Sequence, residues 1–121
     1  MTAPDDVTPV AASSIENWDH EADVVIAGYG IAGAAAAVEA TRAGADVLVI
    51  DLRASCGGFT LGGLMTSLDG EVIHVSGEPI PGLYAAGRCT AGLAAWGYAS
   101  GISLGDGSFY GRRAGRAAAR G

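Results

Sequence analysis

The stretch DVVIAGYGIAG, residues 23–33, carries the strongest indication of the fold. Its first half, residues 23–27, is an apolar run that predicts a buried strand. A glycine turn at 28–30 follows and leads into a segment rich in alanine, the residue with the highest helix propensity. A helix is therefore predicted over 31–43, and Gly44 is placed to end it as a left-handed cap.

A second apolar run at 46–50 predicts a strand parallel to the first, and Asp51 follows it directly. Glycines spaced GxGxxG between two such strands are typical of a dinucleotide-binding βαβ unit. In such a unit Gly28 makes the tight turn, Gly30 admits a pyrophosphate and Gly33 lets the helix lie on the strand. Asp51 is placed to accept hydrogen bonds from an adenosine ribose, and its charge disfavours the 2′-phosphate of NADP. FAD and NAD share the pattern, so both stay open at this point.

Composition limits the remaining classes of function. The 121 residues suit one domain, and 50% of them are apolar, so we expect a folded chain. A net charge of −6 without any lysine argues against nucleic acid. No apolar run reaches membrane-spanning length, and neither a leader segment nor metal-ligand spacing is visible. Cys56 and Cys89 form no CxxC pair, so we expect free thiols and a cytoplasmic protein.

The second half of the chain repeats the order strand, glycine, loop, helix. A hairpin is predicted around Asp69-Gly70, a turn at 79–82, a short buried strand at 83–86 and a last helix from about 106 to 119. Gly105-Asp106-Gly107 would then lie at the start of that helix, where unpaired N–H groups carry partial positive charge. Two helix N-termini in one small domain can bind two parts of one ligand, a pyrophosphate and an electron-rich ring.

Two further stretches carry a resemblance to a known family. PIPGLYAAGR, residues 79–88, resembles the motif with which flavoproteins close over the flavin end of FAD. AWGYASGISLGDGSFYGR, residues 95–112, resembles the C-terminus of 3-ketosteroid dehydrogenases of the Δ4-(5α) type. These enzymes belong to the fumarate reductase and succinate dehydrogenase flavoprotein superfamily, and the resemblance runs from about Trp18 to Ala119. It implies noncovalent FAD and an α/β, Rossmann-like domain with a small, mainly parallel sheet flanked by two helices, plus a β-hairpin.

The resemblance also implies a cofactor site. It would combine the first glycine turn and helix start, the acid after the second strand, the loop behind it, the second glycine turn and the start of the last helix. The residues implied are Gly28, Gly30, Ile31, Ala32, Gly33, Asp51, Leu52, Arg53, Ser55, Gly57, Gly58, Ala86, Gly87, Arg88, Ser103, Leu104 and Asp106. The last helix would aim its N-terminus at the flavin N1–C2=O2 edge, where reduction places negative charge.

The chain departs from this family in length. Family members are several times longer, whereas here residues 56–60 run almost directly into 61–64, so the beginning and the end of a flavoenzyme are joined. We interpret residues 21–121 as one minimal FAD-binding domain, engineered or naturally reduced, behind an irregular arm at 1–20. Sheet edges and apolar faces that the missing part would cover predict a homo-oligomer, most simply a two-fold dimer.

The catalytic residues implied by the resemblance are Tyr98 and Ser100, which match the family's GYxSG segment. A second tyrosine, which the family supplies from the missing part, has no counterpart, so steroid turnover is not expected while flavin redox chemistry is. The alternatives are an NAD-binding module without flavin and a folded fragment or scaffold without catalysis. Arg112, Arg113, Arg116 and Arg120 are predicted to form a solvated face, or alternatively an intersubunit contact.

Overall fold

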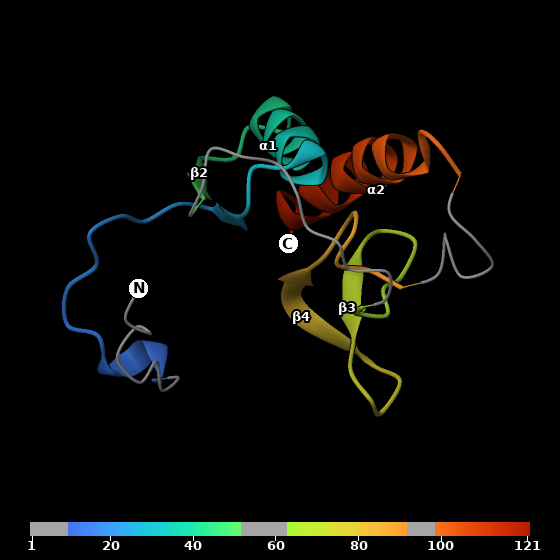
Figure 1. The fold of residues 1–121 in the computed structure, drawn as a ribbon. Helices are drawn as coiled ribbons and strands as arrows, with labels where there is room; N and C mark the ends of the chain where they lie inside the picture. Colours follow the sequence, from blue (N-terminus) through green and yellow to red (C-terminus); the bar gives the residue numbers. More distant parts are fainter. Residues whose placement is uncertain (1–9, 52–62, 92–98) are drawn as a thin grey trace, which may run out of the picture.

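The computed structural model describes residues 10–51, 63–91 and 99–121 (Figure 1). Strands β1 (Val24–Ala27) and β2 (Val47–Ile50) pair in parallel, with Val24 opposite Val47 and Ala27 opposite Ile50. Helix α1 (Ile31–Arg42) connects them. The predicted βαβ unit is therefore confirmed, with boundaries that differ by one residue.

The C-terminal end of α1 shows why the helix stops where the sequence predicts. Gly44 has a φ of 93°, in the left-handed region that favours glycine. Its N–H donates to the carbonyl of Thr41 at 3.0 Å, and the N–H of Ala45 donates to the carbonyl of Ala40 at 3.1 Å. These two bonds form a Schellman motif, which satisfies carbonyls that the helix leaves unpaired. The predicted cap at Gly44 is confirmed.

A second, antiparallel pair consists of β3 (Glu71–Ile73) and β4 (Pro79–Tyr84). The turn predicted at Asp69-Gly70 lies just before it: the N–H of Gly70 donates to the carbonyl of Ser67 at 3.0 Å. Thr66 and Val72 form an isolated antiparallel bridge across this turn. A short helical turn, η1 (Ala12–Ser14), is the one regular element that the described residues contain before β1.

The path from β3 to β4 corrects one prediction. The turn lies at 74–78, where Gly77 has a φ of 93° and donates to the carbonyl of His74 at 2.9 Å. Pro79 and Pro81 belong to strand β4, which ends at Tyr84, so the predicted turn at 79–82 and buried strand at 83–86 are wrong. Proline lacks an N–H donor but is tolerated in an edge strand, and this strand is largely exposed.

Helix α2 (Ile102–Ala118) also corrects a prediction, because it begins four residues earlier than expected. Gly101 has a φ of 87°, and its carbonyl accepts the N–H groups of Leu104 and Gly105 at 3.1 and 3.0 Å. The segment 105–107 therefore lies inside the helix. Its two glycines weaken the local helix propensity, which is why the pattern read from the sequence placed the start too late.

Packing against α1 explains these glycines, as α1 and α2 lie side by side (Figure 1). A Cβ at position 111 would lie 2.9 Å from the Cα of Ala32, and one at position 115 would lie 2.6 Å from the Cα of Ala36. We call the contact the glycine seam; it joins Gly107, Gly111 and Gly115 of α2 to Ile31, Ala32 and Ala36 of α1. Residues later in the sequence of α2 contact residues later in the sequence of α1, so the two helices run in the same direction.

These elements form the small α/β fold, with two helices, a parallel strand pair and an antiparallel hairpin, that the sequence predicts. Within the described part of the chain, the buried apolar side chains are Val24, Ala40, Val72 and Ala114. Many large apolar side chains are exposed, among them Val38 at 50% and Phe109 at 57%. The helices among these residues include none with the length and apolar character needed to cross a membrane.

Candidate cofactor site

The first component of the site is the turn between β1 and α1. Gly28 has a φ of 101°, a conformation that side chains other than glycine rarely adopt. Its N–H donates to the carbonyl of Ile50 at 2.7 Å, which ties the turn to the end of β2. A Cβ built on Gly28 or Gly30 meets no atom within 4 Å, so the main chain of the turn is open to a ligand.

Gly33 fixes how α1 lies over this turn. A Cβ there would overlap the carbonyl oxygen of Gly28 and lie 3.3 Å from Cγ2 of Ile26. Only glycine permits this approach, which is the close helix–strand packing that the sequence predicts. The first turn of α1 is thereby held directly above the glycine turn, with the positive end of its dipole at the ligand side.

Asp51 reaches the same place from the end of β2. Its Oδ2 accepts a hydrogen bond from the N–H of Tyr29, at the tip of the glycine turn. The two residues are 22 positions apart in sequence, so the parallel register of β1 and β2 brings them together. The arrangement places one exposed carboxylate beside an open stretch of main chain.

The second glycine turn meets the start of α1. Gly87 has a φ of 80°, and a Cβ there would lie 2.9 Å from the Cβ of Ala32 and 3.7 Å from the Cα of Gly107. Thr90 holds the turn, because its N–H and its Oγ1 both donate to the carbonyl of Gly87, at 3.0 and 2.8 Å. Ala86, Gly87 and Arg88 are therefore brought to the amino end of α1.

The start of α2 lies at the same end of the molecule, because the two helices run in the same direction. Ser103 and Leu104 occupy its first turn. Asp106, predicted at the helix start, lies instead in the second turn, and burial raises the pKa of its carboxyl group. The N-termini of the two helices, each with partial positive charge, thus lie at the same end of the helix pair, with Gly87 beside Ala32 and Gly107.

Other predicted site residues are not brought into this arrangement. Ser100 lies exposed in the turn that precedes α2. The described ranges do not include six predicted residues: Leu52, Arg53, Ser55, Gly57, Gly58 and Tyr98. Cys89 is an exposed free thiol, while Cys56 lies outside the described residues.

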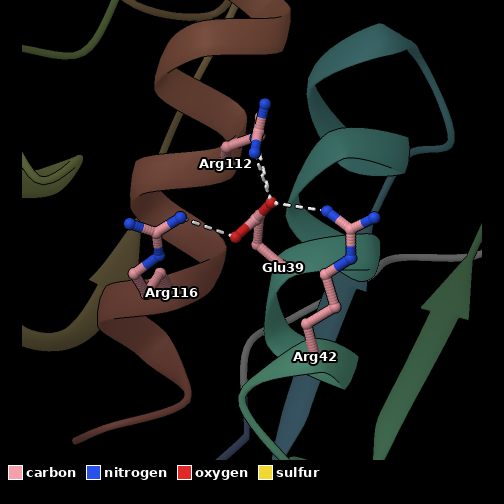
Figure 2. A network of polar contacts seen from close by, with 4 residues as sticks. All are labelled: Glu39, Arg42, Arg112 and Arg116. Carbon is pink, nitrogen blue, oxygen red and sulfur yellow. Dashed lines mark hydrogen bonds and ion pairs between the residues drawn. The ribbon is translucent and has the colours of Figure 1, made fainter.

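Glu39 is a central residue that the sequence analysis missed, and Figure 2 shows its surroundings. Its side chain is only 5% exposed and extends from α1 toward α2. Arg112 Nε donates to Oε1 at 2.9 Å, Arg116 Nη2 donates to Oε2 at 2.7 Å, and Arg42 on α1 adds a longer contact of 3.3 Å. The hydrogen bond from Arg116, supported by Arg112, lowers the pKa of Glu39 from 4.5 to about 2 despite the opposing effect of burial.

The arginines of α2 are therefore not a simple solvated face. Arg112 and Arg116 bind Glu39, and Arg113 binds Asp69 at 2.7 Å and the carbonyl of Leu68 at 2.6 Å. Arg112 and Arg116 stay about half exposed, so they are solvated as predicted while they also pair with an acid of the same chain. The intersubunit contact stays a prediction. One glutamate within an alanine-rich helix, with three arginines in the last helix, was a signal for this pairing.

Comparison with known proteins agrees with this geometry. The chain belongs to the family of FAD dependent oxidoreductases, whose sequence profile matches residues 23–98. FAD is the cofactor of this family, and the open glycine turn beside Asp51 fits its adenosine and pyrophosphate parts.

Its relatives include enzymes named for steroids. A 3-oxo-5-alpha-steroid 4-dehydrogenase of Comamonas testosteroni is 36% identical over 91 residues, which cover 75% of this chain and 16% of that protein. A vinyl phenol reductase of Lactiplantibacillus plantarum is 42% identical over 50% of this chain and 13% of its own length. A 3-ketosteroid-delta4-(5alpha)-dehydrogenase from Rhodococcus jostii, known from a crystal structure, has 52% sequence identity to this chain and a TM-score of 0.48. The alignment covers 69% of this chain and 21% of the dehydrogenase. The chain therefore spans about a fifth or less of the length of these relatives.

Proposed function

We propose that this chain binds FAD noncovalently as a reduced flavoprotein domain. The observation that carries the proposal is the hydrogen bond from Tyr29 to Asp51, which joins the ribose-binding acid to an open glycine turn at the start of α1. The family match over residues 23–98 supports the same cofactor. Residues 21–121 would form the one FAD-binding domain, and residues 1–20 an arm outside it.

The proposed roles follow the order of the site. Amides of the glycine turn and of the first turn of α1 bind the pyrophosphate, and Asp51 accepts hydrogen bonds from the ribose. Leu52, Arg53, Ser55, Gly57 and Gly58 continue the site toward the flavin, as the family resemblance implies. Gly87, Arg88 and the first turn of α2 orient the flavin end, where the positive helix terminus favours a reduced, negatively charged ring.

Flavin redox chemistry is the activity that we propose for the bound cofactor, which supplies two-electron transfer when present. Tyr98 and Ser100 match residues that assist ketone substrates in the family, but the steroid dehydrogenase of Comamonas aligns with this chain over only 16% of its length. Steroid turnover is therefore not proposed for this chain. A reduced domain made by joining the two ends of such an enzyme, by engineering or by natural loss, accounts for this length.

A thermal melt of cofactor-stripped protein with FAD, with NAD or with neither tests the proposal. FAD at 100 times its dissociation constant should add about 2.7 kcal/mol to the free energy of unfolding and raise the midpoint by several degrees. Asp51→Ala should weaken FAD binding by roughly tenfold or more, since a hydrogen bond to a charged group contributes about 1.5–3 kcal/mol. Asp46→Ala, at the opposite end of β2, serves as the matched control and should bind as the wild type does.

The other outcomes of the same melt separate the alternatives. A shift with NAD alone would replace the proposal by an NAD-binding module without flavin. A midpoint that neither dinucleotide moves would leave a folded fragment or scaffold. Equal losses of affinity in Asp51→Ala and Asp46→Ala would remove Asp51 from the site.

We also propose that the chain self-associates, most simply as a two-fold dimer. Val38, on α1, is 50% exposed, which is typical of an apolar face that a partner covers. Light scattering should give twice the mass of one chain, and Val38→Glu should return it to that of one chain. A mass that Val38→Glu does not change would argue against this face. The cytoplasmic location stays a prediction.

A further inference from the structure

A groove of about 300 Å³ lies along the contact of α1 and α2, beside the Glu39 cluster of Figure 2. Apolar side chains of α1 form much of its lining: Ile31, Ala34, Ala35 and Val38. Val38 is 50% exposed, so this apolar lining is open to solvent. Arg42 and Arg112 line the same groove. We call it the helix groove.

The helix groove carries excess positive charge. Three arginines, Arg42, Arg112 and Arg116, share the carboxylate of Glu39 at 3.3, 2.9 and 2.7 Å. Within this cluster, three positive charges against one negative charge leave an excess of two. The arginine side chains are 68%, 55% and 49% exposed, whereas Glu39 is 5% exposed, so the positive charge is the part that a partner meets. A complementary partner combines an apolar anchor with acidic residues.

The arm at residues 1–20 has this chemistry. Its four acids are Asp5, Asp6, Glu16 and Asp19, and it contains neither lysine nor arginine. Trp18 lies between the last two of these acids and is 53% exposed. Glu16 and Asp19 are exposed as well. A tryptophan with charged neighbours is typical of the residues that anchor protein interfaces.

The arm extends from β1 away from the helix pair of its own chain (Figure 1). In its described part, residues 10–20, the hydrogen bonds join near neighbours: the N–H of Ser14 donates to the carbonyl of Ala11, and that of Ile15 to the carbonyl of Ala12. The large apolar surface of Trp18 is thus left half in water, although burying it would be favourable. An arm that points outward is available to a second copy.

We propose that the arm of one copy docks in the helix groove of a second copy, with Trp18 against Val38 and the neighbouring acids beside Arg42 and Arg112. A two-fold axis makes the contact reciprocal, so one dimer contains two such contacts. The inference rests on the proposed self-association and names the segment that covers Val38. It leaves both glycine turns open to FAD.

Two full-length variants test the docking, first separately and then as a mixture. Trp18→Ala removes the anchor from the arm, and Val38→Glu places a carboxylate in the groove. Each change should weaken the dimer at least about tenfold, so each variant alone should have the mass of one chain. Mixed in equal amounts at the same concentration, the two should form dimers, because the arm of Val38→Glu still fits the groove of Trp18→Ala. Light scattering measures the mass.

Val10→Ala is the matched control on the arm. Val10 is 67% exposed but lies outside the stretch 16–19, so this variant should keep the mass of the wild type. Circular dichroism shows whether each variant is folded. Raised salt should weaken the wild-type dimer, since it screens exposed charges. A dissociation constant that salt leaves unchanged would overturn the pairing of the acids with the arginines.

The remaining results distinguish this docking from self-association in general. If the wild type and Trp18→Ala both have the mass of two chains, the docking of the arm is overturned and self-association stands. If the wild type has the mass of one chain, both are overturned, including the case in which the arm folds back onto its own groove. If neither variant dimerises and their mixture does not either, the arm and the groove are not in contact.

Discussion

Gly115→Ala should lower the free energy of unfolding by about 1–3 kcal/mol, although the same change in an ordinary helix raises it by about 0.8–1 kcal/mol. The reason is the glycine seam. A Cβ at position 115 would lie 2.6 Å from the Cα and 2.7 Å from the carbonyl carbon of Ala36. These main-chain atoms cannot move to another rotamer as a side chain can, so the two helices would have to separate. Urea denaturation followed by circular dichroism measures the change.

Gly105→Ala is the matched control on the same helix. A Cβ there meets no atom within 4 Å, and Gly105 lies inside α2 with an ordinary φ. This variant should be more stable than the wild type by up to about 1 kcal/mol, because alanine has the higher helix propensity. A stability gain in Gly115→Ala equal to that of Gly105→Ala would contradict the close approach of α1 and α2.

Acid should weaken the fold through Glu39. Its pKa of about 2 in the folded chain lies below the ordinary value of 4.5, so the fold favours the charged carboxylate. The contribution of Glu39 to the free energy of unfolding is complete above about pH 4.5 and is lost as the pH falls toward 2. Urea midpoints measured across this window should fall with pH in the wild type. The midpoints should fall less steeply in Glu39→Gln. The urea midpoint of this variant is already lower at pH 4.5, because it lacks the charge that pairs with Arg112 and Arg116.

Arg116, in α2, and Arg120, just beyond its end, supply the controls for this result. Arg116 makes the hydrogen bond with the largest effect on the pKa of Glu39, so Arg116→Gln should also flatten the pH profile. Among the described residues, Glu39 pairs with Arg42, Arg112 and Arg116 and not with Arg120, so Arg120→Gln should keep the wild-type slope. Subtracting the Glu39→Gln profile removes the contribution of Asp106, whose raised pKa acts in the opposite direction. Identical slopes in wild type and Glu39→Gln would exclude the carboxylate as the source.

Local sequence signals predicted the first half of the fold. Gly28 and Gly44 both adopt the left-handed backbone that glycine favours, so the turn and the helix end could be read directly from residue types. Asp51 could also be placed, because parallel strands of equal length carry their ends to the same edge. The cofactor class followed from these residues together with the resemblance over 79–112.

Contacts between distant segments explain what the sequence did not reveal. The start of α2 was placed too late because Gly105 and Gly107 are poor helix formers, and only the contact of Gly107 with Ile31 shows why the helix continues through them. The pairing of Glu39 with Arg112 and Arg116 spans 73 and 77 positions. Prolines close together in sequence are typical of a turn, but β4 is an edge strand, where a residue without an N–H donor is tolerated.

The glycine seam also determines how the molecule unfolds. Four glycines inside α2 cost about 0.8–1 kcal/mol each relative to alanine, so this segment has little tendency to be helical when it is alone. Its helix persists only while it is docked on α1. Backbone amides along α2 should therefore become accessible together, when the two helices part, and not by fraying from one end. A single opening event would then release the last helix and dismantle the flavin end of the site with it.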